Sequence, residues 1–268
     1  MILLLGGTSS ASPLALRLAE AGYRVLISKA TTIPLEIATH PNLESRSGPL
    51  DEPGLVRLIA ERGIRAIVDA THPYAGVIHE IACRVAGSCG IPYLSLMRER
   101  TIIEPGAGVE FAADHASAAR AAFAHRRPVL LTTGSKNLAA YVAEARRSGV
   151  SLMVRALDHA DSIETCRRAG IDDAQMILGR GPYSIADNRR QIRQFGIGAL
   201  VTKDSGPAGG TAEKLEAAQA EGCRVIVVER PRHADLGEYA IRFTDVSALI
   251  QELGERMKVE GERGRGDG

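Results

Sequence analysis

The sequence contains no tryptophan, and its tyrosines and phenylalanines bring the aromatic content to only 4%. Proteins that bind single-stranded nucleic acid stack bases on aromatic side chains, so this class is disfavoured. The net charge of +1 provides no general attraction to nucleic acid or to a membrane surface. No apolar run is long enough to span a bilayer, and the apolar start at residues 2–5 is too short for a signal peptide. We therefore predict a cytoplasmic protein that binds neither nucleic acid nor membrane.

Cysteine and histidine patterns that hold metals are also missing. The cysteines, at positions 83, 89, 166 and 223, show no C-x-x-C spacing, and three of them fall within helical or strand patterns. We expect them to be buried free thiols. The seven histidines form no H-x-x-x-H or H-E-x-x-H cluster, so no metal site is predicted. The sequence carries no signal for an oligomeric state.

What the chain does contain is an alternation of short apolar runs with helical stretches, which predicts βαβ units and parallel sheets. We predict an α/β protein with two doubly wound, Rossmann-like or flavodoxin-like domains and a cleft between them. The domains would be residues 1–127 and 128–253, joined at the charged, proline-stopped link 125–128, with a disordered tail at 254–268. Strands are expected at 2–6, 23–28, 66–70, 91–95 and 109–112, then at 128–133, 151–155, 175–179, 199–203 and 224–229.

The first strand runs directly into a glycine turn. Gly6 and Gly7 follow Ile2–Leu5, and a helical pattern begins soon after. Glycines at such a strand end let a phosphate approach the backbone, and the start of the next helix favours its charge. The turn does not match G-x-G-x-x-G, however, and glycines that merely form a tight β-to-α turn remain an alternative.

The end of the second predicted strand indicates which dinucleotide would bind. An NAD-preferring site usually has an acidic residue there, which binds the ribose 2′-hydroxyl. This chain has Ser28 and Lys29 instead. A hydroxyl and a cation suit a 2′-phosphate, so the expected cofactor is NADP(H). A solvated surface lysine is the alternative for Lys29.

Polar and glycine residues also follow the later strands, where ligands of open parallel sheets collect. The two halves begin alike, since the strand and turn at 129–136 repeat the pattern of residues 3–9. A weak internal duplication would explain this likeness, but the shared pattern of two doubly wound sheets is the favoured explanation.

These segments carry a family resemblance. Leu-Leu-Leu-Gly-Gly-Thr at 3–8, Asp-Ala-Thr-His-Pro-Tyr-Ala at 69–75, Thr-Thr-Gly-Ser-Lys-Asn-Leu at 132–138 and Leu-Val-Thr-Lys-Asp-Ser-Gly at 200–206 resemble the precorrin-6A reductase family, as do 90–94, 181–184, Asn188 and 229–231. The resemblance covers nearly all of residues 1–232. It implies a cobalamin-pathway enzyme with two α/β domains that uses NADPH to reduce one double bond of a tetrapyrrole, precorrin-6A, to give precorrin-6B. Cobalt-precorrin-6A reductase is the close variant.

For this reaction we assign the first half to the cofactor. Gly6, Gly7, Thr8 and Ser9 would hold the pyrophosphate, and Ser28 with Lys29 the 2′-phosphate. The loop after strand 66–70 would form a platform for cofactor and substrate through Thr71, His72, Pro73 and Tyr74. His72 is a candidate proton donor because its pKa lies near neutrality, with capping of the next helix as the alternative.

The second half would bind the substrate carboxylates through Arg and Lys. Lys203 is expected first as a substrate or cofactor contact and second as a catalytic acid, with Asp204 or water as other proton sources. The expected substrate-binding residues are Thr133, Gly134, Ser135, Lys136, Arg155, Arg180, Tyr183, Ser184, Lys203, Ser205, Gly206 and Arg230, and Arg98 is a further candidate. A reductase of another polyanionic metabolite and a non-catalytic dinucleotide sensor are the alternatives.

Overall fold

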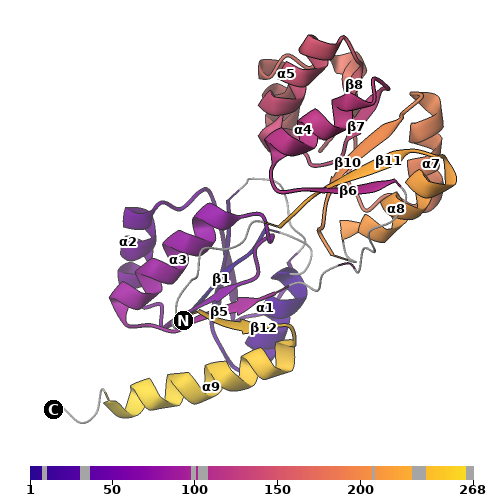
Figure 1. Cartoon of the computed structure of the whole chain (residues 1–268). Helices are drawn as coiled ribbons and strands as arrows, with labels where there is room; N and C mark the ends of the chain where they lie inside the picture. The colour runs from indigo at the N-terminus through magenta and orange to yellow at the C-terminus, as the bar shows by residue number, and fades with distance from the viewer. Residues whose placement is uncertain are drawn as a thin grey trace. The chain divides into compact units, whose positions relative to one another are not determined.

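A computed structural model describes residues 1–7, 11–30, 37–97, 101, 108–206, 209–230 and 240–263. The chain divides into two compact units, in which unit 1 comprises Met1–Arg98 with Arg232–Gly268 and unit 2 comprises Glu99–Pro231. Figure 1 shows the helices and strands of both units along the chain. In the described residues, each unit has a six-stranded sheet with parallel pairing throughout. The predicted fold class of doubly wound α/β sheets is confirmed.

The sheet of unit 1 has the order β3-β2-β1-β4-β5-β12, which is the doubly wound order of dinucleotide-binding folds. The strand β1 pairs with β2 on one side and with β4 on the other. The strands are β1 Ile2–Leu5, β2 Val25–Lys29, β3 Leu43–Ser47, β4 Ala66–Asp69, β5 Tyr93–Leu96 and β12 Ala240–Phe243.

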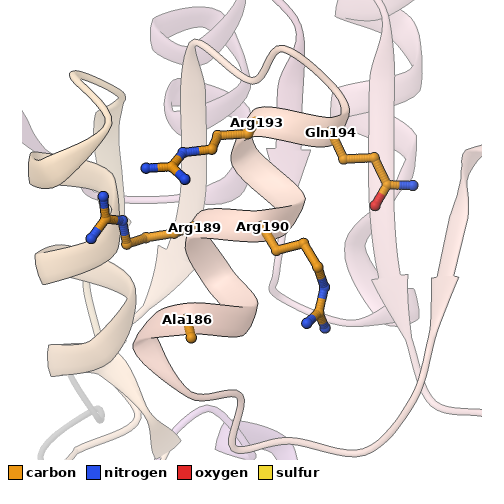
Figure 2. A pocket seen from close by; sticks show the side chains of 5 residues that line it. All are labelled: Ala186, Arg189, Arg190, Arg193 and Gln194. Atoms are coloured by element: carbon orange, nitrogen blue, oxygen red, sulfur yellow. The ribbon is translucent and has the colours of Figure 1, made fainter.

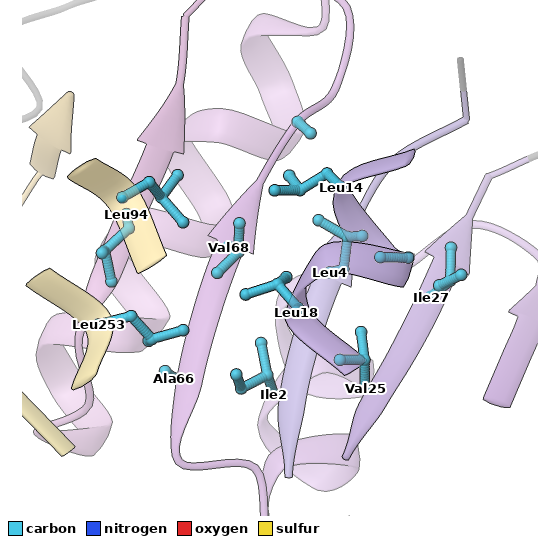
Figure 3. Close-up of a cluster of buried hydrophobic side chains, with 13 residues drawn as sticks. Ile2, Leu4, Leu14, Leu18, Val25, Ile27, Ala66, Val68, Leu94 and Leu253 are labelled. Carbon is cyan, nitrogen blue, oxygen red and sulfur yellow. The ribbon is translucent and has the colours of Figure 1, made fainter. Parts of the chain in front are cut away.

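Helices cover both faces of this sheet, because every residue of β1 is apolar and buried and successive side chains point to opposite faces. On one face, Leu14, Leu18 and Leu253 pack against Ile2 and its neighbours (Figure 3). On the other face, residues of α2 and α3 pack around Leu3. The helices are α1 Ala11–Glu20, α2 Glu52–Arg62, α3 Gly76–Cys89 and α9 Val246–Arg263.

The sheet of unit 2 has the order β9-β8-β7-β10-β11-β6. The helices α7 and α8 pack on one face through Ile192 and Ala217, which contact Leu130 and Leu200 of the sheet. The strands are β6 Val109–Ala112, β7 Val129–Leu131, β8 Leu152–Ala156, β9 Met176–Leu178, β10 Ala199–Lys203 and β11 Arg224–Val228. The helices are α4 His115–Ala124, α5 Ala139–Ser148, α6 Ala160–Arg168, α7 Ile185–Gln194 and α8 Thr211–Ala220, with 3₁₀ turns η1 Ser135–Asn137 and η2 Asp173–Gln175.

The division of the chain differs from the predicted boundary at 127/128. The strand β6, expected in the first domain, pairs with β11 of unit 2, so residues 125–128 connect two elements of one unit. At the other end, β12 pairs with β5 and returns the chain to unit 1. The predicted disordered tail is also wrong in its first part, since α9 continues to Arg263 and buries Leu253. Residues 264–268 lie outside the described part.

Two strands were not expected from the sequence, β3 and β12. Both lie at an edge of the first sheet, and their side chains are at most half-buried. Edge strands have one unpaired side and need no continuous apolar run, so β3 has the polar sequence Leu-Glu-Ser-Arg-Ser. Among the helices of the described residues, we find none that is both long and apolar enough to cross a membrane.

Candidate functional site

Each sheet has one point where neighbouring strands send their following helices to opposite faces. In unit 1 this point lies between β1 and β4, where Leu5 pairs with Asp69. In unit 2 it lies between β7 and β10, where Leu131 pairs with Val201. Ligands of doubly wound folds bind outside the carboxyl ends of the strands at such points. The predicted site residues described by the structure follow strand ends of the two sheets.

The glycine turn after β1 brings the strand end close to α1. The amide of Gly6 donates a 3.0 Å hydrogen bond to the carbonyl of Ser28, and a Cβ added at Gly6 would overlap the Cβ of Ala11. At Gly7 the nearest atom to an added Cβ would be the Cβ of Lys29, at 3.9 Å. The close approach therefore requires glycine at Gly6, whereas a Cβ at Gly7 would make only an ordinary van der Waals contact with Lys29. The predicted contacts Thr8 and Ser9 lie outside the described residues.

The end of β2 carries a hydroxyl and two cationic side chains. Ser28 is 6% exposed, and its Oγ accepts a 2.7 Å hydrogen bond from Nη1 of Arg46. Arg46 lies opposite Ser28 on β3 and also donates to the carbonyl of Gly48. Lys29 follows Ser28 and is half-buried. The sequence singled out Ser28 and Lys29 but not Arg46, because an arginine in a polar segment is ordinary until the pairing of β2 with β3 is known.

The loop after β4 presents half-buried polar side chains. The rings of His72 and Tyr74 lie 5.4 Å apart between centroids, and Nδ1 of His72 accepts a 3.3 Å hydrogen bond from the amide of Tyr74. With Nδ1 accepting, Nε2 is the ring nitrogen that carries the proton in the neutral form. Thr71 is tied back to Asp69 through its amide and hydroxyl. The four predicted residues of this loop, Thr71 to Tyr74, are thus together at the end of β4.

Beneath this loop lies a buried polar network that sequence reasoning did not single out. Asp69 is 1% exposed and receives hydrogen bonds from the Tyr93 hydroxyl at 2.6 Å and from Nδ1 of His79 at 2.7 Å. Burial opposes ionisation of Asp69, yet the hydrogen bonds from His79, Tyr93 and Thr71 hold its pKa below the usual value. Burial and the Asp69 charge raise the pKa of Tyr93, which therefore stays neutral and donates its proton.

In unit 2 the turn after β7 is fastened to β10. Thr132 donates from its amide at 2.9 Å and from its hydroxyl at 2.8 Å to the carbonyl of Val201. Gly134 has a φ of +82°, which favours glycine, and η1 follows with Lys136 exposed. The hydroxyl of Thr133 is buried and has no hydrogen-bond partner within the described part of the chain. The turn therefore presents a threonine hydroxyl and a lysine at the strand edge.

Positive charge accumulates beside this turn. Burial lowers the pKa of Lys203 at the end of β10, and nearby Lys136 lowers it further. His115, at the start of α4, has its pKa lowered to about 4 by burial and by Lys203, and its Nδ1 lies 2.8 Å from the Tyr141 hydroxyl. His115 is therefore neutral at pH 7, and it was not among the predicted residues. These effects on the pKa values indicate that Lys203 lies near both Lys136 and His115.

Asp204 and Arg230 form a buried ion pair. Asp204 is 8% exposed, and its Oδ2 lies 3.1 Å from Nε of Arg230, which is 7% exposed. Arg230 also donates to the Asp204 carbonyl at 3.0 Å, and Oδ1 of Asp204 accepts from the amides of Thr101 and Gly206. Through these contacts the Asp204 carboxylate links the end of β10 to the end of β11. Its predicted role as a proton donor would require breaking several of these contacts.

The end of β8 holds an arginine whose guanidinium is incompletely paired. Arg155 is 5% exposed, its Nε donates to Gln191 at 2.6 Å, and its Cζ lies 4.3 Å from the ring centroid of Tyr183. Both Nη1 and Nη2 are buried and have no hydrogen-bond partner among the residues that the structure describes, and the same holds for the Tyr183 hydroxyl. Burial lowers the pKa of Arg155 to about 10, so it remains charged at neutral pH. A buried guanidinium of this kind is stabilised when an anion binds to it.

Lys214 on α8 adds a second buried cation to this region. It is 8% exposed, and its Nζ donates to the carbonyl of Gly209 at 2.8 Å. Burial and the charge of Arg155 lower its pKa to about 8, while Glu213 acts in the opposite direction. No motif indicated Lys214, since a lysine in the first turns of a helix is usually solvated.

Two predicted substrate contacts are arranged differently. The hydroxyl of Ser184 accepts from the amide of Asp187 and donates to its carboxylate at 2.7 Å, so Ser184 caps α7. Arg180 is exposed on the segment between β9 and α7. Ser205 and Gly206 follow Lys203 as predicted, and Ser205 donates from its amide to the Thr211 hydroxyl. Arg98 lies outside the described residues.

A surface hollow of about 610 Å³ on the outer side of α7 is lined by arginines (Figure 2). Arg189 and Arg193 both pair with Glu221, at 2.6 and 2.8 Å, and Arg190 pairs with Asp187 at 2.6 Å. These charges are compensated by carboxylates of the same unit, in contrast to the guanidinium of Arg155. We therefore place the candidate site at the strand ends and not in this hollow.

Comparisons with known proteins concern nearly the whole chain. A family model described as precorrin-6x reductase CbiJ/CobK matches residues 1–254. A cobalt-precorrin-6A reductase from Priestia megaterium is 32% identical over 254 residues, which cover 94% of this chain and 98% of that protein. A precorrin-6A reductase from Mycobacterium tuberculosis is 34% identical over 231 residues, covering 86% and 88%. A solved structure described as CobK precorrin-6A reductase has a TM-score of 0.75 at 24% identity and covers 95% of this chain and 96% of that one.

Proposed function

Because the chain belongs to the precorrin-6x reductase CbiJ/CobK family, we propose that it reduces one double bond of precorrin-6A to give precorrin-6B, with NADPH as the reductant. The observation that carries the proposal is the match over residues 1–254, which includes the polar strand ends of both units. Curated relatives are named for the cobalt-free and for the cobalt-containing substrate, so both forms are candidates.

The end of the first sheet fits a nicotinamide dinucleotide phosphate. Gly6 and Gly7 carry no side chain that would keep a pyrophosphate away from the backbone of this turn. Ser28, Lys29 and Arg46 would hold the 2′-phosphate, because a guanidinium and an ammonium bind phosphate oxygens strongly. When bound, the cofactor supplies the hydride. The protein has to position it, exclude competing reactions and leave the reacting face accessible.

The strand ends of the second sheet would bind the carboxylates of the tetrapyrrole. Arg155 supports this role most directly, because two of its guanidinium nitrogens are buried and no described residue is hydrogen-bonded to them. Lys203, with its lowered pKa, and Lys214 increase the positive potential at the same edge of the sheet. A polyanion would compensate the buried charge of Arg155 and would be attracted by the positive potential around it.

The reduction also needs a proton at the carbon next to the one that receives the hydride. His72 and Lys203 are the candidate donors, since each is half-buried at a strand end. Nε2 of His72 carries a proton in the tautomer that fits its contact with Tyr74. Lys203 loses its proton more readily than an ordinary lysine because of burial and Lys136. A positioned acid typically contributes about 10²–10⁴-fold to the rate.

The deciding experiment mixes the purified protein with NADPH and either precorrin-6A or its cobalt complex, and follows the absorption of cofactor and macrocycle. We expect NADPH consumption to match loss of the substrate chromophore in a one-to-one ratio. Samples that lack one component serve as controls. Unchanged spectra with both authenticated substrates would refute the proposal. Dinucleotide binding without turnover would favour a sensor, and turnover of another polyanion a different reductase.

A further inference from the structure

The carboxylate of Asp69 is surrounded by donors. Its side chain is 0% exposed, and Oδ1 accepts from the Thr71 amide at 2.9 Å and the Thr71 hydroxyl at 2.8 Å. Oδ2 accepts from the Tyr93 hydroxyl at 2.6 Å and faces Nδ1 of His79 at 2.7 Å. Four such contacts satisfy both oxygens of a carboxylate. Asp69 is therefore a fixed negative charge, and Nδ1 of His79 carries a proton that points at it.

The other ring nitrogen of His79 faces a second acceptor. His79 lies in the first turns of α3 and is 6% exposed, and its Nε2 is 3.3 Å from the carbonyl oxygen of His72. A carbonyl can only accept, so this contact needs a proton on Nε2 as well. The distance is at the long end of the range for N–H···O bonds. With donors required at both nitrogens, the geometry fits an imidazolium.

Burial and the start of a helix both disfavour a cation at His79, and Asp69 outweighs them. Burial alone would lower the pKa of His79, but the hydrogen bond and charge of Asp69 raise it above the usual value, with help from the His72 carbonyl and Glu80. The titratable and charged groups around this network are Asp69 of β4, His72 of the loop, Glu80 and Cys83 of α3, Tyr93 of β5 and Arg242 of β12.

We propose that His79 is a positioning residue whose imidazolium links the carboxylate of Asp69 to the carbonyl of His72 and so holds the loop Thr71–Ala75 in its cofactor-binding shape. This inference rests on the proposed function, in which that loop meets the nicotinamide cofactor. The His72 carbonyl also accepts a 2.8 Å hydrogen bond from the Ala75 amide, so the turn does not depend on His79 alone. Loss of His79 should loosen the loop without unfolding α3.

The link has a defined dependence on pH. When the pH rises through the pKa of His79, the proton leaves Nε2, because the carboxylate retains the one on Nδ1. The lone pair of Nε2 then faces the carbonyl oxygen, and the attraction becomes a repulsion. Because the pKa is raised in the folded protein, the contribution to cofactor binding is present below this pKa and is lost above it.

The test measures the Kd for NADPH by cofactor fluorescence, without substrate, between about pH 6 and pH 9. In His79→Asn, the amide can serve Asp69 but does not reach the His72 carbonyl. We expect its Kd to be about three- to ten-fold higher than that of the native protein at low pH, with a flatter pH profile. In His79→Gln, the longer side chain reaches further, so partial rescue is expected. His125→Asn, which changes a histidine of unit 2 that lies near Glu110, is the matched control.

Two results would overturn the proposal. One is a folded His79→Asn protein with the native Kd and the native pH profile. The other comes from ¹⁵N NMR of the native imidazole, which should show both nitrogens protonated near pH 6; a neutral ring there would exclude the imidazolium link. If the native protein bound neither NADPH nor NADH, the proposed function would fail, and the NMR measurement would still decide the state of His79.

Discussion

The two units share the order of five strands and differ in the origin of the sixth and in the buried charges at their strand ends. In each sheet the central pair, β1–β4 or β7–β10, marks the switch point. The edge strand β12 follows the whole of unit 2 in the chain, whereas the edge strand β6 is the first strand of unit 2. At the end of β4, the buried charge of Asp69 has donors on both oxygens. At the ends of β8 and β10, burial lowers the pKa values of Arg155 and Lys203.

This difference matches the two binding roles that we propose for the units. In unit 1 the glycine turn and the fully hydrogen-bonded carboxylate of Asp69 suit a ligand that is held by the backbone. Cationic side chains lie at the end of β2, where Arg46 donates to Ser28. In unit 2 cationic side chains lie at or near the strand ends, where a ligand rich in carboxylates would compensate their charge. The following predictions test whether the two units are separate in structure and in binding role.

The largest expected effect concerns the C-terminal helix. Leu253 of α9 is fully buried against the first sheet, although it lies after all of unit 2 in the sequence. We expect Leu253→Ala to destabilise the protein by about 2–5 kcal/mol, through lost burial and the resulting cavity. Hydrogen exchange should accelerate in β1, β4 and β5 and stay unchanged in β7 and β10. Glu255→Ala, at an exposed position of α9, is the control. Faster exchange in unit 2 alone would contradict the assignment of α9 to unit 1.

The second prediction removes the incompletely paired cation of unit 2. Arg155→Met keeps the length of the side chain but cannot bind a carboxylate. We expect the KM for the tetrapyrrole to rise by about 30-fold or more, with the Kd for NADPH unchanged. Thermal stability should stay equal or increase, because a buried charge without full pairing is removed.

The control for this change is Arg189→Met, since Arg189 lies on the surface of the same unit and is paired with Glu221. Steady-state kinetics and thermal unfolding of both variants provide the comparison. If Arg155→Met had the native KM and a lower melting temperature, Arg155 would stabilise the fold of unit 2 and would not bind the substrate.

The third prediction concerns the margin of the unit 1 site. Arg46→Leu should weaken NADPH binding by about ten-fold and leave NADH binding unchanged, because only the 2′-phosphate meets the guanidinium. Lys29→Glu should act in the same direction by repulsion. Arg24→Leu, which alters the opposite end of the same strand pair, is the control. Fluorescence titration measures the affinity for each dinucleotide. If the variants weakened NADPH and NADH binding equally, Arg46 and Lys29 would not contact the 2′-phosphate.

The sequence was sufficient for the central strands of both sheets and for the family. Strands such as Ile2–Leu5 and Leu152–Ala156 are buried on both faces, so their apolar runs identify them without further knowledge. The family resemblance, drawn from motifs at strand ends, is confirmed by the match to residues 1–254. The edge strand β3 was missed because a polar strand has no such run, and the boundary was misplaced because β6 and β12 pair with strands distant in the chain.

The candidate site could be predicted only in part, for the same physical reason. Residues in the last positions of strands, such as Ser28 and Arg155, can be placed from the chain alone, since the carboxyl ends of parallel strands lie at one edge of a sheet. Their partners cannot. Arg46, His79 and Lys214 reach these ends from other elements, and a lone charged residue in a helix or polar strand gives no signal until the tertiary contacts exist.

The smallest expected effect tests the coupling between the two lysines of unit 2. Lys136 lowers the pKa of Lys203 through its charge, in addition to the larger effect of burial. Lys203 loses its charge as the pH rises through this pKa, so the KM for a carboxylate-bearing substrate should rise at alkaline pH. In Lys136→Gln the neighbouring charge is absent, the pKa of Lys203 moves up, and the alkaline rise in KM should begin at higher pH. The midpoint of the pH profile is the measurement, because a direct contact of Lys136 with substrate would change the level of KM at all pH values without moving the midpoint. The contrary outcome is an unmoved midpoint in Lys136→Gln together with loss of the alkaline rise in Lys203→Gln. It would mean that Lys203 contacts the substrate and that the charge of Lys136 does not influence its pKa.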